Sequence, residues 1–152
     1  MSIDTLLIPT DGSETADAAV RRGFSFAEQL DARGHLLTVV EASAVDSPSE
    51  TADADDATAD GSPVTGRERA TSQLDELAAD GRDRGLVVQT TMRDGRPVDG
   101  IVDHAATAAV DLIVMRTAGR GGFDRLLLGS VADAVVRTAP TPVMTVRPSD
   151  GE

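Results

Sequence analysis

A glycine-rich segment near the end of the chain could bind a phosphate group. The apolar run DLIVM precedes this segment, which contains Gly119, Gly121 and Gly122. Glycine allows positive φ and close backbone approach to a ligand. Gly129 and Ser130 then open a helical pattern, and the free N–H groups at a helix start favour an anion. This order of strand, loop and helix predicts a phosphate-binding loop. A tight connection capped by Ser130 is the alternative.

Arg116 stands where the chain leaves that apolar run. Its long side chain could fill the space that a ligand needs, or its guanidinium could pair with a phosphate, which it suits well. Arg120 and Arg125 are close in sequence and could assist, or they could be solvated charges that pair with Asp124. The standard P-loop pattern is missing, because the chain contains no Lys.

The first apolar run ends in the segment PTDGS, which contains Asp11. In an open parallel α/β sheet, ligands bind outside the carboxyl ends of strands, where the strand order reverses. The PTDGS segment and the glycine-rich loop therefore form the two candidate walls of one site.

Other groupings with chemical potential are weak. His35 and His104 are far apart in sequence, and we expect packed or surface histidines rather than metal ligands. HExxH spacing is missing, as is a GxSxG elbow, so neither a zinc hydrolase nor a serine hydrolase is supported. No general base is recognisable for hydrolysis. We therefore expect no catalytic or metal-binding residues.

Short apolar runs alternate with helical patterns along the whole chain. Strands are expected at 5–9, 35–40, 86–92, 110–115 and 142–146. These runs lack clean polar alternation, which predicts a parallel sheet covered by helices on both faces. The buried face of the first helix is expected to comprise Ala16, Ala19, Val20, Gly23, Ala27 and Leu30. The later helices are marked by Ala70, Leu74, Leu77 and Ala78, by Val98, Ile101, Val102 and Ala105, and by Val131, Ala134 and Val135.

Residues 46–66 differ in composition from the rest of the single domain expected over 1–152. They are rich in Asp, Ser, Thr, Ala and Pro and contain no basic residue. Such a segment cannot bury enough apolar surface to offset its ordering entropy. It is therefore predicted to be a mobile acidic loop, with a functional lid as the alternative.

The charge balance restricts the possible partners. The chain has 26 acidic residues against 14 basic ones, all Arg, for a net charge of −12. A surface this acidic repels nucleic acid and anionic membranes, so neither is an expected partner. The composition is typical of a halophile whose cytosol holds high salt, or of an ordinary acidic protein. The absence of Cys, of a signal peptide and of a long apolar run fits a cytoplasmic location.

Three segments together resemble the universal stress protein family. They are LLIPTDGSE near the start, GRPVDGIVDHA in the middle and VDLIVMRTAGRGGFDRLLLGSVADAVVRTAPTPVMTVRP at the end. The resemblance covers nearly the whole chain apart from the acidic segment. It implies a Rossmann-like α/β fold with a five-stranded parallel sheet in the order 3-2-1-4-5. It also implies a homodimer paired through the C-terminal strand, at about 142–147.

The ATP-binding branch of this family carries the pattern G-x2-G-x9-G-[ST]. The second glycine of the pattern matches Gly119, the third matches Gly129 and the hydroxyl residue matches Ser130. The first glycine falls on Arg116, and Ala118 replaces a common histidine of the loop, so the sequence departs from the pattern at both places.

On the nucleoside side, the family's Asp matches Asp11, and a valine whose backbone meets adenine matches Val39. The candidate nucleotide-binding residues are Pro9, Thr10, Asp11, Val39, Arg116, Gly119, Arg120, Gly129, Ser130 and Val131. The resemblance implies a regulatory module that binds ATP, with Mg²⁺ held mainly by the phosphates. A dimeric interaction protein with a vestigial cleft is the alternative, and a slow ATP hydrolase or nucleotidyl-transferring enzyme is a third possibility.

Overall fold

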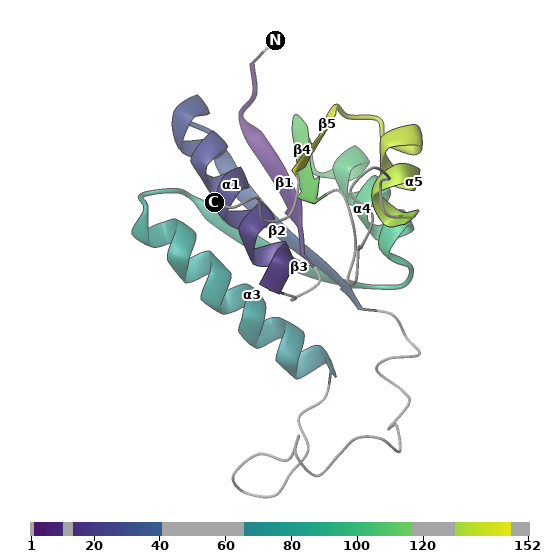
Figure 1. The fold of residues 1–152 in the computed structure, drawn as a ribbon, viewed down its shortest axis with the longest axis horizontal. Coiled ribbons are helices and arrows are strands. Elements are labelled where there is room, and N and C mark those ends of the chain that lie inside the picture. The colour runs from purple at the N-terminus through teal and green to yellow at the C-terminus, as the bar shows by residue number, and fades with distance from the viewer. Residues whose placement is uncertain (1, 11–13, 41–65, 117–129, 147–152) are drawn as a thin grey trace, which may run out of the picture.

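The computed structural model describes residues 2–10, 14–40, 66–116 and 130–146 (Figure 1). Within these ranges five strands form one parallel sheet in the order β3-β2-β1-β4-β5. The strands are β1 (Thr5–Pro9), β2 (Arg33–Val40), β3 (Val88–Asp94), β4 (Leu112–Arg116) and β5 (Val143–Val146). The expected fold class and strand order are therefore confirmed.

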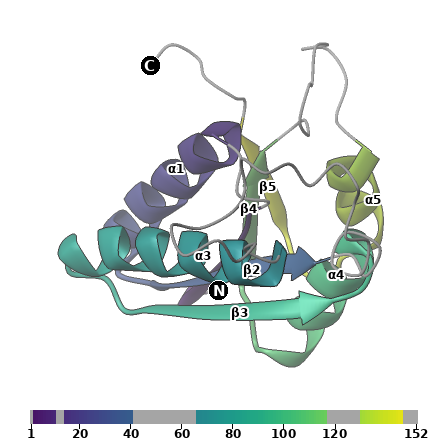
Figure 2. The ribbon, with the colours of Figure 1, turned by 90° about the horizontal axis from the view of Figure 1, so that it is seen from below.

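Helices cover both faces of the sheet, as the apolar strand sequences predict. The described helices are α1 (Glu14–Leu30), α3 (Gly66–Asp83), α4 (Pro97–Thr107) and α5 (Ser130–Thr138). Figures 1 and 2 show α1 and α3 on one face and α4 and α5 on the other. Because side chains alternate along each strand, the sheet separates two apolar layers.

The layer beneath α1 and α3 is the larger of the two. Leu6 and Ile8 of β1, Leu36 of β2 and Val114 of β4 point into it and are fully buried. Phe24 of α1 also lies here with 0% exposure. The layer beneath α4 and α5 contains the alternate strand residues, together with Ile101, Ala105, Ala132 and Val135 from the two helices.

Some details of the expected elements are wrong. β2 begins at Arg33 rather than at residue 35, and β4 covers Leu112–Arg116 rather than 110–115. Leu30 is 43% exposed, because it is the last residue of α1 and lies beyond the packed part of the helix. Phe24, which the helical pattern omitted, fills the core instead. The third strand begins at Val88 rather than at residue 86, since the N–H of Leu86 donates to the carbonyl of Gly81 (3.2 Å) and so closes the end of α3.

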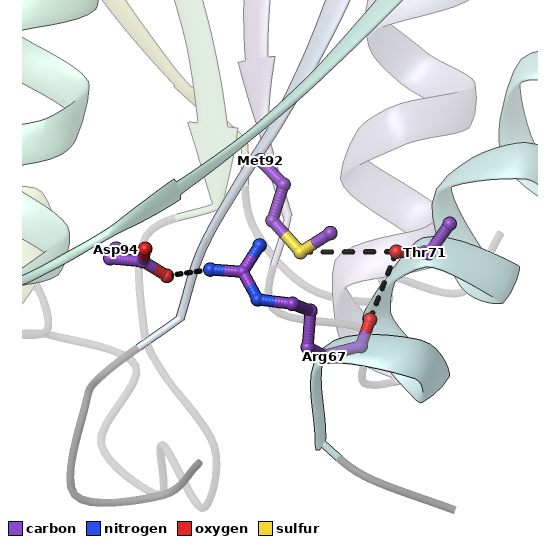
Figure 3. Close-up of polar contacts among 4 residues, drawn as sticks. All are labelled: Arg67, Thr71, Met92 and Asp94. Carbon is purple, nitrogen blue, oxygen red and sulfur yellow. Dashed lines mark hydrogen bonds and ion pairs between the residues drawn. The ribbon is translucent and has the colours of Figure 1, made fainter. Parts of the chain in front are cut away.

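Polar contacts connect the start of α3 to the end of β3 (Figure 3). The Arg67 guanidinium pairs with the Asp94 carboxylate. The Thr71 hydroxyl donates to the Arg67 carbonyl (2.9 Å) and lies 4.0 Å from the Met92 sulfur. The Arg67 and Asp94 side chains are substantially exposed, so this pair contributes orientation more than stability.

The predicted acidic loop falls almost entirely on residues 41–65, outside the described ranges, and its last residue, Gly66, begins α3. None of the described helices combines the length and the apolar character needed to cross a membrane.

Candidate functional site

The strand order reverses between β1 and β4, and in open α/β sheets ligands bind outside the carboxyl ends of the strands at such a reversal. The chain continues from β1 to α1 on one face of the sheet, whereas it continues from β4 to α5 on the opposite face (Figure 2). The elements that follow the two central strands, α1 and α5, therefore lie on opposite faces of the sheet. The described residues at this edge include Thr10, directly after β1, and Arg116, the last residue of β4.

Three buried polar residues lie side by side at this edge. The N–H of Thr10 donates to the Leu37 carbonyl (2.9 Å), and the Thr38 hydroxyl donates to the Thr10 carbonyl (3.1 Å). β1 pairs with β4 at Leu6–Leu112 and Leu7–Ile113, and from this register we expect Thr10 to lie near Arg116. Thr10, Thr38 and Arg116 are 7%, 8% and 9% exposed. A row of polar groups thus crosses the three central strands.

Arg116 is packed rather than extended into solvent. It is registered with Val146 of β5, and strand alternation puts it on the face of Leu112 and Val114, beneath α1. A buried guanidinium needs polar partners to offset its desolvation. Arg116 is therefore a buried charged residue at the exit of β4.

Ser130 begins α5 and is exposed, so its hydroxyl is accessible. The helix is anchored below it, because Ala132 and Val135 are buried in the layer beneath α4 and α5. Val131 is partly buried against the same layer. The first N–H groups of a helix have no partner within the helix, so an anchored helix start of this kind can bind an anion.

The end of β2 is closely covered by α4. Val39 packs against the layer beneath α4, and a Cβ placed on Gly100 would come within 2.6 Å of Val39 Cγ2. Only glycine permits this approach of helix to strand. Because its side chain is occupied in this way, Val39 can meet a ligand at the edge of the sheet through its backbone. Pro9, the last residue of β1, is partly buried at the same edge.

Four of the predicted site residues lie outside the described ranges: Asp11, Gly119, Arg120 and Gly129. The six described candidates come from the ends of β1, β2 and β4 and from the start of α5, four elements whose ends meet at one edge in this topology.

The structure also brings together two residues that the sequence analysis treated as isolated. His35 Nε2 of β2 and His104 Nε2 of α4 are 3.1 Å apart, and the two rings meet edge to face. His35 Nε2 is also 2.8 Å from the Thr91 hydroxyl of β3. Burial is the main cause that lowers the pKa of both histidines. The neighbouring His104 lowers the pKa of His35 further, and the neighbouring Arg93 lowers the pKa of His104 further.

Comparisons with known proteins agree with this fold. The model of the universal stress protein family matches residues 2–147. Universal stress protein MJ0531 of Methanocaldococcus jannaschii is 32% identical over 151 residues, which cover 93% of this chain and 81% of that protein. The structure of protein MJ0577 of the same organism superposes with a TM-score of 0.77 at 25% identity, covering 99% of this chain and all of the other.

A second solved structure is a universal stress protein in complex with cAMP. It superposes with a TM-score of 0.72 at 25% identity and covers 98% of this chain and 100% of its own.

Proposed function

The chain belongs to the universal stress protein family, and we propose that it binds ATP in the crevice between β1 and β4 as a regulatory module. The observation that carries the proposal is the exposed Ser130 at the start of an anchored helix, beside the reversal of strand order. The cAMP complex of a relative with the same fold supports a nucleotide as the ligand class.

We propose different roles for the residues on the two sides of the crevice. The nucleoside would lie against Pro9, Thr10 and Asp11 after β1 and against the backbone of Val39. The phosphates would lie at the start of α5, held by its free N–H groups and by the Ser130 hydroxyl. The phosphate side also includes Gly119, Arg120, Gly129 and Val131.

Any Mg²⁺ would be held mainly by the phosphates. Among the described residues at this edge, Thr10 and Ser130 are proposed to bind and orient the nucleotide, and neither side chain is a general base. We therefore propose binding rather than turnover, with at most slow hydrolysis. We further propose a cytoplasmic homodimer joined through β5, in which nucleotide binding biases the dimer or a partner surface.

A titration of ATP by calorimetry in molar KCl, with Mg²⁺ present, tests the proposal. Ser130→Ala should weaken ATP binding by roughly 1.5–3 kcal/mol, the value of a hydrogen bond to a charged group. Ser130→Thr is the matched control, because it keeps the hydroxyl and should bind like the wild type. Equal affinity of the Ala and Thr variants would remove Ser130 from the site.

A dimeric interaction protein with a vestigial cleft is the second candidate, and the burial of Arg116 favours it. An arginine packed at the exit of β4 occupies the position of a family glycine. Copurification distinguishes the two candidates. The chain has no Trp and no Tyr, so bound nucleotide would dominate the absorbance near 260 nm. Protein that carries no nucleotide and gives no heat with ATP would support the second candidate.

A further inference from the structure

The contact between His35 and His104 is a polar feature inside an otherwise apolar layer. The two residues are 8% and 9% exposed. Leu37, Ile101 and Ala105, close to them in sequence on β2 and α4, belong to the apolar layer beneath α4 and α5. A histidine pair in such a place introduces groups that titrate near neutral pH into the interface between a helix and the sheet.

This pair is one of the places where α4 meets β2. Gly100 lies against Val39, and His104 lies against His35. Each member of the second pair is four residues from its counterpart in the first, so both residues of α4 share one helix face and both residues of β2 share one sheet face. One contact is apolar and tight, and the other depends on protonation.

The geometry requires at least one of the two rings to be neutral. A hydrogen bond between two Nε2 atoms at 3.1 Å needs an N–H on one ring and a lone pair on the other. If both rings become cationic, two N–H groups face each other and two charges lie in contact. The Thr91 hydroxyl lies 2.8 Å from the same Nε2 atom of His35, so it competes with His104 for the one N–H or lone pair of that atom and cannot offset a second positive charge.

The surrounding charges oppose protonation further. From β3, Arg93 acts on His104 as a like charge and lowers its pKa. From β1, the residue registered with His35 is the uncharged Leu7. From α5, Ala132 and Val135 contribute to the same layer. The acidic residues of α4, Asp99 and Asp103, are exposed and so are screened by solvent.

We propose that the contact between His35 and His104 is a proton-sensitive latch, which holds α4 on the sheet at neutral pH and loosens it under acidic conditions. Because burial lowers the pKa of both histidines, the unfolded chain binds protons more readily than the folded one. The stabilising effect is therefore complete above the unfolded value near 6.5 and is lost as the pH falls through the lower folded values.

The chain contains two histidines, and both belong to the latch, which makes the test direct. Urea unfolding is measured between pH 7.5 and 5.5, above the range where carboxylates titrate. The unfolding equilibrium constant of the wild type should rise by up to about tenfold for each histidine. In the double variant His35→Gln with His104→Gln, which keeps polar groups near the Nε2 positions, it should stay flat over this range.

A local readout separates a latch from a histidine pair that serves packing alone. Hydrogen exchange, corrected for the intrinsic effect of pH, should show loss of protection in α4 but not in α3 as the wild type is acidified. NMR titration of the two histidine ring protons should show both protonating below pH 6.5.

Three results would overturn the latch. The first is equal pH dependence in the wild type and the double Gln variant. The second is parallel loss of protection in α3 and α4. The third is a histidine that protonates at or above pH 6.5, and this measurement on the wild type decides the matter even if the variants do not fold.

Discussion

At the scale of single residues, Arg116 decides between the two candidate functions. It is buried at the exit of β4, where the matching family position is a glycine. The backbone N–H groups at the start of α5 do not depend on its side chain. Any effect on ATP binding should therefore be steric, at the ribose and the first phosphate.

Arg116→Gly should tighten ATP binding about tenfold, which corresponds to about 1.4 kcal/mol. Calorimetry measures this against the wild type. Arg116→Met is the matched control, since it keeps most of the length and removes the charge. If the steric account holds, the Met variant binds like the wild type. Weaker binding by both variants would instead make Arg116 a phosphate ligand.

A third outcome selects the other function. If the wild type binds no ATP while Arg116→Gly binds it clearly, the natural cleft is vestigial and the interaction protein is the better description.

Sequence reasoning at this scale succeeded where a pattern is local. The match of Ser130 to a helix start needed only the spacing of glycines, and the helix begins at that residue. The pairing of His35 with His104 could not be seen in the same way, because 69 positions separate the two residues. A usable signal was present: His35 alternates with Leu37 and Val39 on β2, while His104 follows Gly100 by four residues on α4.

At the scale of elements, β5 is the edge strand that the proposed dimer would use. The Ile113 N–H donates to the Pro142 carbonyl (2.9 Å), and Ile113 is registered with Val143. In a parallel ladder, this register and hydrogen bond mean that the N–H groups of Met144 and Val146 point toward β4. The N–H groups of Val143 and Thr145 therefore point to the open edge. An unpaired apolar edge favours association with another strand.

Thr145→Pro should convert the proposed dimer to a monomer, because proline removes an N–H from the open edge and spares the bonds to β4. Light scattering in molar KCl measures the mass. Met144→Pro is the matched control: it removes a bond to β4 and should destabilise the fold as well. A monomeric wild type, or a dimeric Thr145→Pro variant, would contradict pairing through β5.

The elements themselves were predictable because apolar runs and helical spacing are strong local signals, and β1 was found at its observed bounds. The errors fall at ends, where tertiary contacts decide. Leu86 looks like strand sequence, yet its N–H closes the last turn of α3. Leu30 continues the apolar stripe of α1 but extends past the sheet that would cover it.

At the scale of the whole molecule, the dominant feature is the large negative net charge. The net charge is −12, and ion pairs such as Arg67–Asp94, Arg96–Asp99 and Arg137–Asp133 are largely exposed. Exposed pairs contribute about 0.2–1 kcal/mol each, so they offset little of the repulsion among the remaining acidic groups. Between 0.1 M and 1 M salt, the Debye length falls from about 10 Å to about 3 Å, and repulsion over longer distances is screened.

The melting temperature should therefore rise steeply from dilute buffer to molar KCl, by about 2–4 °C for each kcal/mol of repulsion relieved in a chain of this size. Calorimetry across a KCl series measures it. Salt can also strengthen apolar burial, so a charge variant is needed as the control. Asp75→Asn, Glu76→Gln and Asp80→Asn replace three exposed acids of α3. Combined, they should raise the melting temperature in dilute buffer and change it little in molar KCl. A wild-type melting temperature that is flat across the series would count against a protein adapted to high salt.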